Sequence, residues 1–403
     1  MKKLALVALC ALVAAVGVAY IIFKPNLGRL GMAATLFTGA EQYENFSRIK
    51  DMYPTTVLTA APVPYDFPDG EPLTLPDRFS FQDKEYRVAD FLELTDTSAL
   101  LVIQDGKVRF EEYFLTGGRD VNWLSMSVAK SFTSTLVGIA FDEGLIKDLN
   151  EPITDYVPEL KGSAYDKVAI VDVLEMSSGA QWSEDYANPD SEVVRMGKIM
   201  GLGGSLDEFT ASLKPQREPG TFNQYNSADT QALGMLVARA TGRSLTNYMQ
   251  EKLWGPLGAE SDAYWIIDDH NVEMAFAGLN ATARDYAKIG ELFRNGGNWF
   301  GKQIVSRDWV TSATHSTKPH LLPGDNPASD YPLGYGYQWW LMDGDEREYS
   351  AIGVYNQFVY VNPARDLVIV KLSAFSDYAT VETEEGYREL ETIELFRAIG
   401  NAL

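Results

Sequence analysis

The chain has 403 residues, 46% of them hydrophobic and 12% aromatic, so it can bury a large core and extended disorder is disfavoured. A formal net charge of −22 repels nucleic acid phosphates, so we expect no nucleic acid partner. The single cysteine, Cys10, excludes an intrachain disulfide and a cysteine-based metal site.

The N-terminus carries an apolar segment long enough to span a membrane. Lys2 and Lys3 precede 20 uncharged, mostly apolar residues from Leu4 to Phe23. This length favours a signal anchor over residues 1–25, whereas Gly17-Val18-Ala19 would suit cleavage of a signal peptide. Either form predicts an exported catalytic domain, at the periplasmic face of the inner membrane or secreted, with this segment as its membrane contact.

Residues 26–90 hold several prolines and little periodicity, which predicts an extended segment that wraps a folded body. The main domain is predicted over residues 91–403. From Ala99 apolar runs lie on both sides of Asp105-Gly106, and the second run alternates in sidedness. This pattern predicts a hairpin of two antiparallel strands.

A serine three residues before a lysine follows the hairpin, in Ser127-Val128-Ala129-Lys130. Apolar residues at helical spacing continue after it, so Ser127 and Lys130 would share one face at the start of a helix. Burial on that face would lower the pKa of Lys130 and let the amine take the serine proton. The helix N-terminus would aim N–H groups at an oxyanion, which makes Ser127 a candidate nucleophile.

The segment from Glu143 to about Trp340 is predicted as helices and long loops, including helices over 232–241 and 281–295. Three or four strands follow, and then an amphipathic helix from about Glu384 to Ala402. Strands at both ends predict an α+β fold, in which an antiparallel sheet flanked by helices carries an inserted, mostly helical domain of about 145–330. A cleft between the two parts would hold the site.

These motifs resemble the serine β-lactamase and penicillin-recognising superfamily, in particular class C β-lactamases, esterases and 6-aminohexanoate-dimer hydrolases. The family's second motif, Tyr-x-Asn after a Pro-Gly and at a helix start, is matched by Tyr225. The resemblance implies that Tyr225 shares a proton with Lys130 and protonates the leaving group. At the third position, the asparagine that contacts substrate is either replaced by Ser227 or displaced to Asn226.

The family's third motif, Lys-Thr-Gly or His-x-Gly on a strand facing the serine, corresponds to Ala351-Ile352-Gly353. The resemblance implies that Gly353 lets substrate lie along the strand and that the N–H groups of Ser127 and Val354 form the oxyanion hole. In β-lactamases the missing cation faces the drug's carboxylate. Ala351 therefore argues against efficient β-lactam hydrolysis.

Two further runs, Trp182 to Tyr186 and Gly353 to Gln357, look more like the nylon-oligomer hydrolases and esterases. In that branch the aromatic residue of the first run lies near the leaving group. The resemblance therefore implies that Tyr186 contacts substrate.

The sequence gives weaker evidence for a histidine-based active site or a metal site than for the serine–lysine pair. A Ser-His-Asp scheme would need His270, His315 or His320, but the chain has no Gly-x-Ser-x-Gly elbow and surface histidine is the simpler interpretation. Asp268-Asp269-His270 is better explained as a solvated turn than as a metal site. No phosphate-cradling glycine loop is present, so the sequence implies no cofactor.

The sequence thus predicts a serine hydrolase that cleaves a small-molecule ester or amide through an acyl-enzyme on Ser127. Two alternatives stay open. Export favours a D-peptidase or transpeptidase that acts on cell-wall peptides. Ser227 and Ala351, in place of family side chains, favour a non-catalytic binding protein on the same scaffold. Neither the natural substrate nor the oligomeric state is fixed by the sequence.

Overall fold

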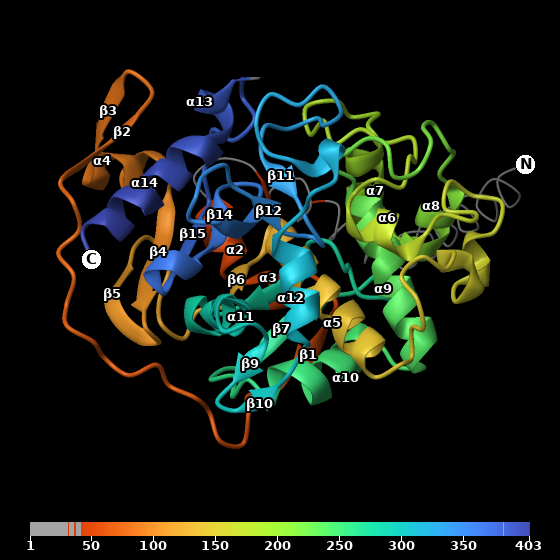
Figure 1. Ribbon diagram of the computed structural model, residues 1–403, viewed down its shortest axis with the longest axis horizontal. Helices are drawn as coiled ribbons and strands as arrows, with labels where there is room; N and C mark the ends of the chain where they lie inside the picture. Colours follow the sequence, from red (N-terminus) through yellow and green to blue (C-terminus); the bar gives the residue numbers. More distant parts are fainter. Residues whose placement is uncertain (1–30, 32–35, 38–41, 382) are drawn as a thin grey trace, which may run out of the picture.

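The computed structural model describes residues 31, 36–37, 42–381 and 383–403 (Figure 1). Its main sheet is antiparallel and has seven strands in the order β11-β12-β13-β14-β15-β4-β5. The predicted hairpin forms β4 (Thr97–Gln104) and β5 (Lys107–Tyr113). The other strands come from the C-terminal part: β11 (Gly334–Tyr335), β12 (Trp340–Leu341), β13 (Tyr349–Gly353), β14 (Gln357–Asn362) and β15 (Leu367–Ser373). One sheet built from both ends of the chain confirms the predicted fold class.

Both faces of this sheet are covered. The central residues of β14 and β15 are therefore apolar one after another, because successive side chains point to opposite faces and both faces are buried. Val359 and Val368 pack against α11 (Ala283–Arg294), where Gly290 has no room for a Cβ because their methyl groups would lie within 3 Å of it. On the opposite face Phe358 lies with its ring centroid 5.3 Å from Phe396 of α14 (Glu389–Asn401).

The predicted last helix is interrupted. Arg388 has a φ of 53°, in the left-handed region, and separates α13 (Glu384–Tyr387) from α14. A left-handed residue that is not glycine gives no clear sequence signal, because its conformation depends on the surrounding contacts. The break turns the start of α14 toward the cavity described below.

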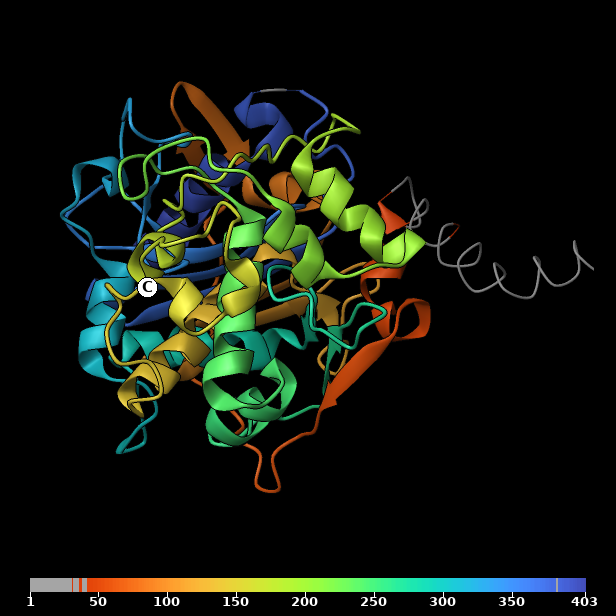
Figure 2. The same cartoon turned by 90° about the vertical axis from the view of Figure 1, so that its right-hand side faces the viewer.

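The helical part gathers on one side of the molecule (Figures 1 and 2). Its centre is the pair α5 (Ala129–Asp142) and α9 (Ser227–Thr241), both largely buried. Shorter helices surround the pair: α6 (Ile170–Leu174), α7 (Glu192–Leu202), α8 (Leu206–Ser212), α10 (Leu245–Met249) and α12 (Arg307–Thr314). A π-helical turn over Gln250–Trp254 continues α10.

A second, four-stranded sheet takes two strands from the segment predicted as helices and loops, so that prediction is wrong for residues 263–266 and 279–281. Its order is β1 (Thr55–Leu58), β7 (Ala263–Ile266), β8 (Leu279–Ala281) and β6 (Trp123–Leu124). These strands are two to four residues long, too short for a periodic pattern to be recognised. A small hairpin, β9 (Asn298–Trp299) with β10 (Lys302–Gln303), also lies in this part.

The segment predicted as extended contains more structure than its prolines indicated. It includes α2 (Gln42–Phe46), α3 (Ile49–Met52), β1, the hairpin β2 (Arg78–Phe81) with β3 (Lys84–Arg87), and the start of α4 (Val88–Leu94). The stretch between β1 and β2 runs along the outside of the molecule without helix or strand (Figure 1). The predicted signal anchor, residues 1–25, lies outside the described residues. Within the described ranges, none of the helices combines the length and apolarity needed to cross a membrane.

Candidate active site

Ser127 lies in a 3₁₀ turn, Met126–Val128, between the end of β6 and the start of α5. The end of strand β13 abuts this turn. A Cβ on Gly353 would lie 2.7 Å from the Ser125 carbonyl oxygen and 2.9 Å from the Ser127 nitrogen, so only glycine fits there. The missing side chain of Gly353 thus makes room for the backbone of the serine turn, whereas its role in letting substrate lie along the strand stays a prediction.

Lys130 lies one turn after Ser127 and is only 1% exposed. Its Nζ is 2.8 Å from Ser127 Oγ, 3.0 Å from Ser227 Oγ and 3.1 Å from the Phe276 carbonyl oxygen. Burial lowers the pKa of Lys130 to about 7, although the charge of Glu184 acts to raise it. A large share of the molecules therefore carry a neutral amine at neutral pH, whose lone pair can accept the Ser127 proton.

Tyr225 precedes α9 and faces the same serine. Its ring stacks on Trp340 at 5.0 Å and lies 4.9 Å from Lys130 Nζ. Burial raises the pKa of the Tyr225 phenol well above 10, as does the charge of Glu184, whereas a hydrogen bond with Ser127 acts in the opposite direction. The phenol is therefore neutral at rest, and it can pass a proton on without being the resting base.

Of the two residues that the sequence offered in place of the family's asparagine, Ser227 is the one that contacts Lys130. Its hydroxyl accepts from Lys130 and lies at the first residue of α9. Asn226 instead caps that helix: its Oδ1 accepts from the Ala228 N–H and its Nδ2 donates to Asp229. Asn226 therefore serves the fold, and Ser227 belongs to the site.

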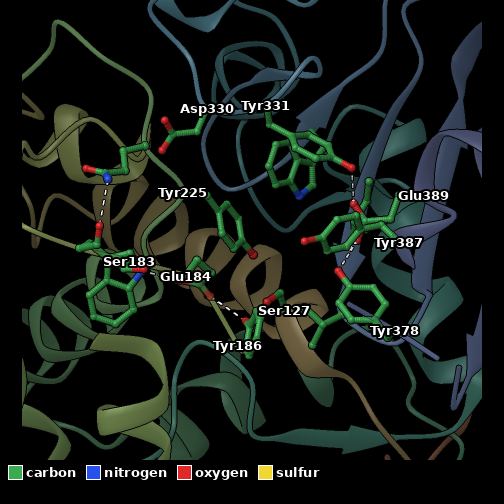
Figure 3. Close-up of a pocket in the computed structure, with 15 residues that line it drawn as sticks. Ser127, Ser183, Glu184, Tyr186, Tyr225, Asp330, Tyr331, Tyr378, Tyr387 and Glu389 are labelled. Atoms are coloured by element: carbon green, nitrogen blue, oxygen red, sulfur yellow. Dashed lines mark hydrogen bonds between the residues drawn. The ribbon is translucent and has the colours of Figure 1, made fainter. Parts of the chain in front are cut away.

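Glu184 completes a chain of hydrogen bonds that sequence reasoning missed. Its carboxylate accepts from Ser227 Oγ at 2.6 Å, from the Tyr186 hydroxyl at 2.8 Å and from Trp182 Nε1. The sequence singled out only Tyr186 in this run, and the structure places Tyr186 beside Glu184 in the wall of the cavity (Figure 3). No pattern in the sequence links Glu184 to a hydroxyl 43 residues further on.

These side chains open into a cavity of about 370 Å³, shown in Figure 3. Ser127, Tyr225 and Val354 line it, so the two residues predicted to supply the oxyanion hole reach the same space. From the third motif it is Ile352 that lines the cavity, whereas Ala351 is buried in the core. The side chain that this motif directs into the cavity is thus apolar.

One interpretation of a polar residue is wrong, and another needs a detail added. His320 is buried, not at the surface, although none of the three histidines lines the cavity. Asp268 is also buried, because its carboxylate accepts from the backbone N–H groups of Leu206, His270 and Val272. Asp269 and His270 form an exposed turn, as predicted, and the Asp268 carboxylate is turned inward and holds it.

A buried serine and lysine and a partly buried tyrosine, at the junction of an antiparallel sheet and a helical part, define a β-lactamase-like protein with a reactive serine. The comparisons agree with this class. The chain belongs to the Beta-lactamase family, whose model matches residues 95–393. It is 34% identical over 346 residues to a 6-aminohexanoate-dimer hydrolase from Paenarthrobacter ureafaciens, covering 82% of this chain and 85% of that protein.

Solved structures show the same β-lactamase/transpeptidase fold. A Bacillus anthracis protein, provisionally a 6-aminohexanoate-dimer hydrolase, superimposes with a TM-score of 0.81 at 23% identity, over 91% of this chain and 95% of that one. A family VIII carboxylesterase gives a TM-score of 0.57 at 19% identity, over 78% and 95%. The relatives of this chain are thus hydrolases.

Proposed function

We propose that the protein hydrolyses an ester or amide bond of a small molecule through an acyl-enzyme on Ser127. The observation that carries this proposal is the 2.8 Å contact between Ser127 Oγ and the buried Lys130 Nζ, whose pKa is lowered to about 7. A lysine in this state can act as a base at neutral pH, which activates the serine for attack.

In the first half of the reaction, Ser127 Oγ attacks the carbonyl carbon while Lys130 takes its proton. The N–H groups of Ser127 and Val354 hold the oxyanion of the tetrahedral intermediate. Tyr225 passes the proton to the leaving oxygen or nitrogen, and the bond to the leaving group breaks. In the second half a water molecule attacks the acyl carbon, its proton passes through the same groups to Ser127 Oγ, and the bond from the acyl carbon to Ser127 Oγ breaks, which releases the acid.

The same geometry bears on the two alternatives. A D-peptidase or transpeptidase would bind a peptide ending in a carboxylate, but the strand offers apolar Ile352 and the cavity wall carries Glu184, Asp330 and Glu389. A non-catalytic binding protein would have no need of a lysine buried against a serine, since burying an amine is costly. Hydrolysis of a substrate without a carboxylate near the scissile bond is therefore the function we favour.

Labelling with a fluorophosphonate and turnover of p-nitrophenyl acetate test this proposal. We expect both in the wild type and neither in Ser127→Ala, with the adduct mass found on the peptide that contains Ser127. Ser183→Ala is the matched control, because Ser183 lines the same cavity and is not hydrogen-bonded to a base. Equal labelling of wild type and Ser127→Ala would refute the proposal.

A further inference from the structure

The end of the cavity opposite Glu184 is lined mainly by aromatic side chains. It is walled by aromatic rings from three separate segments, Tyr331, Trp340 and the pair Tyr378 and Tyr387, around the carboxylate of Glu389 (Figure 3). Tyr331 and Trp340 lie edge to face at 5.1 Å, and Tyr378 and Tyr387 at 5.4 Å. We refer to these five residues as the aromatic end. None of them has a role in the chemistry proposed above.

Glu389 is held firmly but is not neutralised by the protein. It is 7% exposed, and its two oxygens accept hydrogen bonds from the hydroxyls of Tyr331 at 2.6 Å and Tyr378 at 2.8 Å. Within the described ranges no lysine or arginine forms an ion pair with it. Burial raises the pKa of the Glu389 carboxyl, and the two phenol donors, which favour its ionised form, act in the opposite direction.

Most of the other buried glutamates in the described part of the chain have the cation that Glu389 lacks; Glu273, which lines no part of this cavity, is the exception and accepts from the Thr246 N–H. Glu348, 5% exposed, is paired with Arg397, and Glu291, 6% exposed, is paired with Arg294. A buried carboxylate is normally paired with a cation, because removing it from water is costly. The charge of Glu389 thus faces a cavity without a partner from the described part of the chain.

The rest of the cavity wall has the same sign. Glu184 and Asp330 also line it, and none of its lining residues is a lysine or an arginine in the part of the chain that the structure describes. Aromatic faces attract cations through their quadrupole, and cages of aromatic rings bind alkylammonium groups. A carboxylate on the ligand would meet only repulsion here.

We propose that the aromatic end binds an alkylammonium group carried by the substrate, with Glu389 as its counter-ion and the tyrosine and tryptophan rings as its walls. The role in turnover rests on the proposed hydrolase function, whereas the binding itself does not. The substrate class is then a cationic ester or amide, and anionic substrates are rejected.

Pairs of esters that differ only in charge test the turnover. In one pair acetylcholine is compared with its neutral isostere, in which a tert-butyl group replaces the trimethylammonium group. In the second pair the same exchange is made at the far end of the acyl chain of a p-nitrophenyl ester. In at least one pair we expect kcat/KM of the cationic ester to exceed that of the isostere by about tenfold or more.

Glu389→Gln keeps an acceptor oxygen for a tyrosine but removes the charge, so we expect the preference to fall to about onefold or twofold. Its kcat/KM for the neutral isostere should change by less than about threefold, which also shows that the variant is folded. Glu394→Gln, on the same helix and paired with Arg397, is the matched control and should keep the preference. Tyr387→Leu, which removes one ring, is a second variant expected to weaken it.

Binding of choline to Ser127→Ala, measured by calorimetry, separates this inference from the proposed function. If no ester is hydrolysed but choline binds and Glu389→Gln weakens binding by about tenfold, the aromatic end is supported and the hydrolase proposal fails. The inference is overturned if neither pair shows a preference for the cation, if Glu389→Gln retains an observed preference, or if choline fails to bind Ser127→Ala.

Discussion

Replacing Glu184 with glutamine should move the pH dependence of the reaction. Lys130 Nζ and the Glu184 carboxylate are joined through Ser227 Oγ by contacts of 3.0 and 2.6 Å, so the two charges are at most about 5.6 Å apart. At an effective dielectric constant of about 20 their attraction is about 3 kcal/mol, equivalent to about two pH units. Because Glu184 is partly exposed, solvent screening reduces this, and we expect a change of about one to two pH units.

The direction follows from the role of the base. Catalysis needs the neutral amine, so kcat/KM rises with pH through the Lys130 pKa of about 7. Without the Glu184 charge the ammonium form loses its partner, and the pKa of Lys130 falls. The midpoint of the rising limb should therefore move from about pH 7 to between about pH 5 and 6.

The measurement is kcat/KM for p-nitrophenyl acetate from acidic to mildly alkaline pH. Asp330→Asn is the matched control, since it removes a carboxylate from the same cavity wall that does not act on Lys130, and its limb should stay in place. Ser227→Ala keeps the Glu184 charge but removes the hydroxyl that joins Glu184 to Lys130. It should therefore lower kcat/KM more than it moves the midpoint of the rising limb. A limb in Glu184→Gln that stays near pH 7 or moves upward would refute the reasoning.

Three further predictions concern other parts of the molecule. Gly353→Ala places a Cβ 2.7 Å from the Ser125 carbonyl oxygen, so it should lower stability by about 1–3 kcal/mol and kcat by far more than Ser183→Ala does, measured by thermal unfolding and ester turnover. Burial raises the pKa of Asp229 to about 7, so its contribution to stability declines as pH rises from about 4 to 7. Asp229→Asn lacks this titration and should therefore gain thermal stability over wild type more at pH 8 than at pH 5. Nitrocefin, an anionic β-lactam, should be hydrolysed with a kcat/KM at least about a hundredfold below that of a neutral ester, and a comparable value would contradict the anionic character of the cavity.

The parts of the site that depend on local geometry could be predicted from the sequence. Ser127 and Lys130 are three residues apart on a helical start, so their contact follows from the helix itself. The burial of Lys130 was expected from its apolar neighbours and is confirmed. β14 and β15 were also recognisable, because strands buried on both faces are continuously apolar.

What could not be predicted depends on contacts between distant segments. Glu184 acts through Ser227, and only the path of the intervening chain brings the two together. Replacement at Ser227 and displacement to Asn226 were equivalent in the sequence, since the outcome depends on which side chain caps α9. No sequence pattern singles out Glu389, which follows the left-handed residue Arg388 and lines the cavity beside rings from distant segments.

The order of the main sheet has a consequence for the synthesis of this protein. Strand β4 pairs with its neighbour β5, but its other partner is β15, more than 250 residues later in the chain. Loop closure over such a distance is slow, and the nascent chain exposes an unpaired edge of β4 until β15 has emerged. The ribosome releases Ser127 and Lys130 long before Gly353, so the catalytic constellation cannot assemble on a growing chain and is a property of the finished polypeptide alone.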